Sequence, residues 1–132
     1  MVTTTRRKNL SKETTDLINA SISILSKAYY RDLSVVNNEK YTRIIRKTIV
    51  GLRRHGYTGL ADKLWDLWGR LHDFYNIYVK QTANKLLSTG LVSKAYDELP
   101  RDVEYIMSRR EKLWRKTIDL INDLEKLARQ HR

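Results

Sequence analysis

Residues 38–55 of the chain read NEKYTRIIRKTIVGLRRH, and this stretch decides the fold. On a helical wheel with about 100° per residue, it divides into two opposed arcs. The apolar arc contains Tyr41, Ile44, Ile45, Thr48, Ile49 and Leu52. The basic arc contains Lys40, Arg43, Arg46, Lys47, Arg53 and Arg54, and no acidic residue follows Glu39 in this stretch. The pattern predicts an amphipathic helix whose apolar side packs on protein. Because aligned like charges repel one another, the basic side indicates a polyanionic partner.

The charge of the chain is unevenly distributed. Its 132 residues carry a formal charge of +11, with 26 Lys and Arg against 15 Asp and Glu. Residues 1–57 contain 12 basic and 4 acidic residues, a net charge of +8, whereas residues 58–132 contain 14 and 11, a net charge of +3. A strongly basic balance is typical of proteins with phosphate-rich partners. We therefore expect the first part of the chain to bind the polyanion.

Composition argues against several classes of site. The chain has no cysteine, and therefore no disulfide, thiolate zinc site or cysteine nucleophile. The basic start, MVTTTRRK, lacks the apolar stretch of a signal peptide. No run of about 18 apolar residues predicts a membrane span. We expect a protein made in the cytoplasm, without a transmembrane anchor and without a cofactor.

The chain is predicted to be all-α, because it contains one proline, five glycines and almost no alternation of the β type. A first helix is expected to follow Ser11 as its N-cap, with acidic residues near its positive end. Its apolar residues recur at spacings of 4, 3 and 4, and are Ile18, Ile22, Leu25 and Tyr29. Residues 35–38 are expected to form a turn in which Asn37 or Asn38 caps the amphipathic helix.

Helix breakers divide the rest of the chain. Gly56 suits the position after a helix C-terminus, and Thr58 can cap the next helix. That helix is expected over residues 60–89, followed by a short helix over 93–99 and a last helix with Pro100 at its first position. The last helix has an a/d-like apolar seam interrupted by two polar residues. The seam is Val103, Ile106, Leu113, Leu120, Leu124 and Leu127, and the interruptions are Arg110 and Thr117.

Residues 1–57 are thus predicted to form a basic helical arm that binds nucleic acid, and residues 58–132 a small bundle similar to a four-helix bundle. Basic side chains bind phosphates because each contact releases condensed counterions. The residues expected to bind nucleic acid are Arg6, Arg7, Lys8, Lys12, Lys27, Arg31, Lys40, Arg43, Arg46, Lys47, Arg53 and Arg54. Few Asn or Gln accompany these cations, so we expect backbone contacts without sequence preference. The alternative interpretation is the solvated side of an ordinary helix.

Two other groups of residues have alternative interpretations. The first helix is rich in Ser, Thr and Asn, whose side chains can contact phosphate oxygens or can belong to a helix that packs on the body. The aromatic residues are concentrated after residue 57 and could stack on unpaired bases. Their helical spacing among leucines favours packing in the core or at a subunit interface instead.

No pattern of catalytic residues is found. The three histidines, at positions 55, 72 and 131, share no metal-ligand spacing. His72 beside Asp73 could form an acid–base pair, but a single His–Asp step on a long helix is typical of a surface without catalysis. The helix dipole explains the acidic cluster around the proline better than a divalent metal does; the cluster is Asp97, Glu98, Asp102 and Glu104. We expect that the protein is not an enzyme.

A basic, hydroxyl-rich helical arm followed by an aromatic helical bundle resembles the major coat proteins of filamentous viruses that infect hyperthermophilic archaea. The layout is most similar to that of the smaller of the two major coat proteins in an enveloped, lipothrixvirus-type virion. The resemblance covers the whole chain, with the arm ending at about Tyr57 and the bundle running from Thr58 to Arg132. It rests on this layout, since no signature motif carries it.

The resemblance implies a structural protein of the virion whose arm, residues 1–57, wraps linear double-stranded DNA, holds it in A-form and packages it in a helical capsid. It also implies a heterodimer with a second related coat protein, or pairing with a second copy, and contacts with neighbouring subunits in a filament. A lipid envelope would surround that filament. Two other functions stay open. One is a small archaeal chromatin-like or regulatory DNA-binding protein, and the other is an RNA-processing or toxin-type helical enzyme built around His72 or His55.

Overall fold

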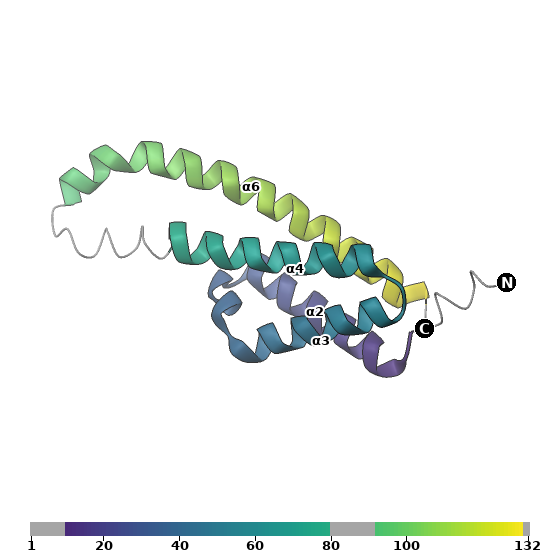
Figure 1. Cartoon of the computed structure of the whole chain (residues 1–132). Helices are drawn as coiled ribbons and strands as arrows, with labels where there is room; N and C mark the ends of the chain where they lie inside the picture. Colours follow the sequence, from purple (N-terminus) through teal and green to yellow (C-terminus); the bar gives the residue numbers. More distant parts are fainter. Residues whose placement is uncertain (1–9, 80–91, 131–132) are drawn as a thin grey trace.

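The computed structural model describes residues 10–79 and 92–130, with side chains for 10–78 and 105–130. The described residues contain helices and no strand, which confirms the all-α prediction. In chain order, the elements are α2 (Lys12–Tyr30), η1 (Leu33–Asn37), α3 (Glu39–Arg54), α4 (Thr58–Asp73), η2 (Phe74–Val79) and α6 (Val92–Gln130). Figure 1 shows the long α6 running beside α4, with α2 and α3 on the other side of α4 in this view.

Local signals start the first two long helices. The Ser11 side chain accepts a hydrogen bond from the backbone N–H of Thr14 at 3.1 Å, which is the geometry of an N-cap. The Asn38 side chain accepts one from the backbone N–H of Tyr41 at 3.2 Å, and α3 begins at the next residue. The N-cap predicted at Ser11 is confirmed, and of the two candidates Asn37 and Asn38, Asn38 is the N-cap of α3.

A short 3₁₀ helix, η1, occupies the place of the turn expected at residues 35–38. The Asp32 carboxylate caps it by accepting hydrogen bonds from the hydroxyl and the backbone N–H of Ser34, at 2.6 and 2.9 Å. These two hydrogen bonds lower the pKa of Asp32 below its ordinary value. Val35 and Val36 are buried, so this segment contributes to the core as well as reversing the chain.

A tight C-terminal closure joins α3 to α4. Gly56 has a φ of 86°, and the N–H of Tyr57 donates to the carbonyl of Leu52 at 2.8 Å, which is the long bond of a Schellman motif. The prediction for Gly56 is confirmed. The prediction that Thr58 caps the next helix is wrong. Tyr57 is the N-cap residue, and no side-chain hydrogen bond caps the helix. The carbonyl of Tyr57 accepts a hydrogen bond from the N–H of Ala61 at 3.1 Å, which is the first bond of α4. Thr58 is therefore already inside the helix and cannot be its N-cap.

The four α-helices in the described part of the chain form a four-cornered bundle. α3 contacts α2 and α4, and α6 contacts the same two helices, whereas α3 and α6 make no contact within the described residues. They therefore lie at diagonally opposite corners. Each helix contributes fully buried side chains to one shared core, and the largest are Ile18, Leu25, Ile45, Leu52, Leu64, Leu71 and Leu124.

The core crosses the point at which the sequence suggested a division of the chain. The division at residue 57 stays a prediction, and it coincides with the connection between α3 and α4. Ile45 and Leu52 before it, and Leu64 and Leu71 after it, belong to the same buried cluster. An arm that left the bundle would therefore have to open this core, at a cost of about 25 cal/mol for each Å² of apolar surface exposed.

Small and polar side chains allow α2 and α3 to approach closely. The hydroxyls of Ser21 and Thr48 lie 2.7 Å apart inside the core, and Thr48 also lies 3.1 Å from the carbonyl of Leu17. A Cβ atom on Gly51 would lie 3.0 Å from Cγ2 of Thr14. Among the described residues, no buried side-chain nitrogen or oxygen lacks a hydrogen-bond partner. The close crossing is therefore achieved without a buried polar group left unpaired.

The apolar seam of the last helix is largely as expected, with one correction. Arg110 is exposed and interrupts the seam, as predicted. Thr117 does not interrupt it, because its side chain is 1% exposed and its hydroxyl donates to the carbonyl of Leu113 at 2.7 Å. A threonine that satisfies its own hydroxyl in this way offers its methyl group to the core. The side chain of Val103 lies outside the described residues.

The boundaries expected for the long helices need correction. The helix expected over residues 60–89 begins at Thr58 and continues from α4 into the π-helical turn η2, and residues 80–89 lie outside the described part of the chain. No break separates residues 93–99 from a helix that starts at Pro100, because α6 runs without interruption through both. An internal proline costs about 3 kcal/mol. Strong helix formers on both sides keep the helix continuous.

Candidate nucleic-acid interface

The two arcs predicted for α3 are confirmed by burial. Ile45, Thr48 and Leu52 are fully enclosed and Ile49 is 6% exposed, while Tyr41 and Ile44 are half-buried at the edge of the core. All six cations of the opposite arc are exposed. We call them the basic surface of α3: Lys40, Arg43, Arg46, Lys47, Arg53 and Arg54. Burial of the apolar side therefore fixes the orientation of α3 and keeps its six cations exposed on the opposite side.

The basic surface is weakly neutralised within the protein. In the described residues, Arg53 is the one cation of the six in an ion pair, with Asp62 of α4 at 3.0 Å. The guanidinium of Arg46 lies over the ring of Trp65, 5.6 Å from its centroid. This contact leaves the charge of Arg46 in place, since an aromatic ring carries no net charge. Five of the six cations are therefore available to an external anion.

Val50 lies at the centre of the basic surface, and the sequence interpretation did not single it out. Its side chain is 51% exposed. Arg46 and Lys47 precede it by four and three residues, and Arg53 and Arg54 follow it by three and four, so all four surround it on the helix. The signal was present in the sequence, because the wheel places Val50 among the cations. An exposed valine at this point can contact sugar or base atoms between flanking phosphates.

A groove runs beside the basic surface, between α3 and the start of α2. It encloses about 380 Å³, and its α3 side includes Arg43, Arg46, Lys47 and Arg54. Among the described lining residues, Glu13 on the α2 side is the single acidic one, and Ser11 and Thr14 lie beside it. Positive charge is therefore found both on the exposed side of α3 and along the wall of this groove.

The cations expected on the first helix lie apart from this groove. Lys12, Lys27 and Arg31 are all exposed, as expected for solvated or ligand-binding side chains, and none of them lines the groove. Lys27 donates a hydrogen bond to the hydroxyl of Tyr41 at 3.0 Å and lies over its ring, on the apolar arc of α3. The remaining three candidates, Arg6, Arg7 and Lys8, lie outside the described residues.

The hydroxyl groups of the first helix serve packing more than ligand contact. Thr14 and Ser21 are buried, and Ser21 is bonded to Thr48 of α3. The Ser11 hydroxyl donates to Oγ1 of Thr14 at 2.9 Å and, through its cap, holds the start of α2. Of the two interpretations of this hydroxyl-rich helix, the contacts favour packing for these residues.

Aromatic residues fall into a core set and a surface set. Trp68 is 3% exposed and donates from Nε1 to the hydroxyl of Thr42 at 3.2 Å, and Phe74 is also buried. Trp65 is 45% exposed and lines a hollow of about 590 Å³ between α3 and α4, together with Arg43 and Arg46. The predicted core packing is confirmed for the first set, whereas Trp65 adds an aromatic surface next to the cations.

The candidate acid–base pair, His72 and Asp73, lies at the surface at the end of α4. His72 Nδ1 lies 3.5 Å from Oδ1 of Asp73, and both side chains are well exposed, at 50% and 72%. No group of three or more His, Asp or Glu in the described residues is placed to hold a metal ion. In the same part of the chain, every helix is too short or too polar to cross a membrane.

Comparisons with known protein families, with curated proteins and with solved structures found no match to this chain. The functional argument therefore rests on the geometry and charge of the site.

Proposed function

We propose that this protein binds duplex DNA without sequence preference through the basic surface of α3, and packages it as a structural coat protein of a virion filament. The observation that carries the DNA-binding part is the division of α3 into an enclosed apolar side and six exposed cations. Burial fixes the orientation of the helix, so the cations are presented as a rigid row about 21 Å long, from residue 40 to residue 54.

The chemistry of the row favours the phosphate backbone over base edges. Besides Glu39 and Val50, the exposed residues of α3 are arginines and lysines, and no Asn or Gln stands among them. Arginine binds phosphate through two parallel hydrogen bonds, whereas sequence readout depends on several side chains that reach base edges. Double-stranded DNA offers one negative charge per about 1.7 Å of its axis, so a row of this length can contact several phosphates at once.

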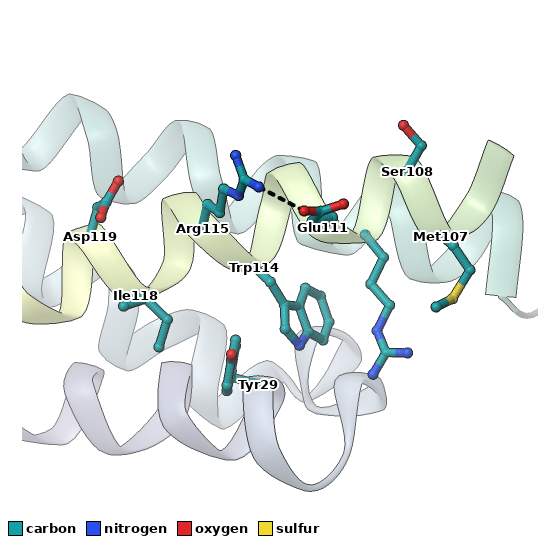
Figure 2. A pocket seen from close by; sticks show the side chains of 9 residues that line it. Tyr29, Met107, Ser108, Glu111, Trp114, Arg115, Ile118 and Asp119 are labelled. Carbon is teal, nitrogen blue, oxygen red and sulfur yellow. Dashed lines mark hydrogen bonds and ion pairs between the residues drawn. The ribbon is translucent and has the colours of Figure 1, made fainter. Parts of the chain in front are cut away.

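Assembly into a coat is supported by apolar residues on the outside of the bundle. Tyr30, Tyr105 and Met107 are exposed at 71%, 50% and 52%. Tyr29 of α2 faces Trp114 of α6 with ring centroids 5.5 Å apart, and both line a groove of about 800 Å³ (Figure 2). Surfaces of this kind on a small protein mark contacts with partners. In the proposed coat, the partner is a second related coat protein or a second copy of this chain.

Purified protein mixed with linear duplex DNA and imaged by electron microscopy tests the proposal. Continuous filaments of fixed diameter on DNA of unrelated sequences are expected. Scattered particles or one discrete footprint would contradict the coat function and favour a chromatin-like or regulatory protein instead. Absence of any DNA binding at low salt would contradict both.

A further inference from the structure

A second basic groove lies between η2 and α6, away from the basic surface of α3. It encloses about 750 Å³ and is lined by five cations, with Asp73 as the one acidic residue among its described lining residues. The cations are Arg70 of α4 and Arg109, Lys112, Arg115 and Lys116 of α6. The sequence interpretation did not single out this cluster, although residues 109–116 contain five basic residues and one acidic residue.

Two tyrosines hold one of these cations in place. Nε of Arg109 donates a hydrogen bond to the hydroxyl of Tyr105 at 3.0 Å, and its guanidinium lies 5.4 Å from the centroid of Tyr105 and 5.8 Å from that of Tyr78. The hydrogen bond with Tyr78 and that from Arg109 lower the pKa of Tyr105. In the described residues, no hydrogen bond uses the two terminal nitrogens of Arg109. The guanidinium is therefore oriented while two donors stay available for an anion.

The other cations form a row along the groove. Arg109, Lys112 and Lys116 follow one another at spacings of three and four residues on one side of α6, over a length of about 10 Å. Lys112 and Lys116 are exposed, and neither forms an ion pair within the described residues. Arg70 and Arg115 pair with Asp66 and Glu111 at 2.8 and 2.7 Å, in exposed pairs that contribute little stability.

We infer that this groove binds the phosphate backbone of a second segment of duplex nucleic acid. A row of this length spans more than one phosphate, and the Ser108 hydroxyl in the lining is a further donor to phosphate oxygens. α3 and α6 occupy opposite corners of the bundle, and none of the six cations of the basic surface of α3 lines the groove of α6. One molecule can then bridge two duplex segments, an inference that rests on the proposed binding of the first segment by α3.

The test uses the full chain and two short duplexes of unrelated sequence. One duplex is fixed to beads, the other carries a fluorophore, and captured fluorescence reports bridging. The double variant Lys112→Glu with Lys116→Glu should keep its affinity for a single duplex, and its affinity for the second duplex should fall by about 60-fold at about 0.1 M salt, since two phosphate contacts disappear. Arg110→Glu with Lys126→Glu is the matched control, because it makes the same charge change on α6 outside the groove.

The outcomes separate the groove from the α3 surface. Bridging by Lys112→Glu with Lys116→Glu at the wild-type level would refute the groove, and so would an equal loss in the control. Arg43→Glu with Lys47→Glu should still bind a single duplex at low salt but fail to bridge; complete loss of binding would also refute the groove. Unchanged affinity in that α3 variant would refute the proposed function instead. Groove-dependent binding to phosphatidylserine vesicles, with duplex bridging unaffected, would assign the groove to lipid and overturn the inference.

Discussion

Reversing two charges at the centre of the basic surface of α3 should weaken DNA binding by about 60-fold or more at about 0.1 M salt, without loosening the bundle. Arg43 and Lys47 are exposed, line the groove beside α2, and form no ion pair within the described residues. Arg43→Glu with Lys47→Glu therefore removes two phosphate contacts and places two negative charges against the DNA.

The magnitude follows from counterion release. Each phosphate contact contributes about 0.9 to the slope of log affinity against log salt, so the variant should have a slope shallower by about 1.8. At about 0.1 M salt, measured against 1 M, two contacts contribute about 60-fold in affinity, and repulsion by the new glutamates adds to the loss. The thermal midpoint should stay close to that of the wild type, because exposed charges contribute about 1 kcal/mol or less each.

Fluorescence anisotropy with a labelled duplex over a salt series measures the slope, and differential scanning calorimetry measures the midpoint. Arg110→Glu with Lys126→Glu is again the charge-matched control and should bind a single duplex nearly as the wild type does. The reasoning is refuted if the α3 variant keeps the wild-type slope, or if the control loses affinity to the same extent. In the second case, net charge alone would explain binding.

Three further predictions concern the bundle itself. Ile45→Asp should lower the free energy of unfolding by about 3 kcal/mol or more, because it buries an unpaired charge at a fully enclosed site, and denaturant unfolding checks this. Gly51→Leu should cost about 1 to 3 kcal/mol by the same measurement, because the new side chain meets Thr14 of α2, whereas an unchanged midpoint would show that the crossing can widen. The lowered pKa of Asp32 means that its bonds to Ser34 stabilise the protein fully above its ordinary pKa of 3.8. This contribution should fade as the pH falls through the lower folded-state pKa, so the thermal midpoints of the wild type and Asp32→Asn should converge in acid.

Much of the fold could be predicted from sequence because its signals are local. The N-caps at Ser11 and Asn38 and the left-handed glycine at position 56 act through residues at most five positions away. The two arcs of α3 also follow from sequence, because a helix fixes the direction of every side chain relative to its axis. The helix start predicted at Pro100 is wrong, because the strong helix formers on both sides of this single helix breaker outweigh it.

The sequence by itself determined that the chain is helical and that α3 turns an apolar side inward and a basic side outward. Only the tertiary structure decided which cations of different helices share a surface. Arg70 of α4 lines one basic groove together with Arg109, Lys112 and Lys116 of α6, because α6 packs beside α4 and η2. Likewise, Gly51 became a contact point because α2 crosses α3 at that residue. Electrostatic potential and packing depend on distances in space, and residues far apart in the sequence come within those distances only when the helices pack.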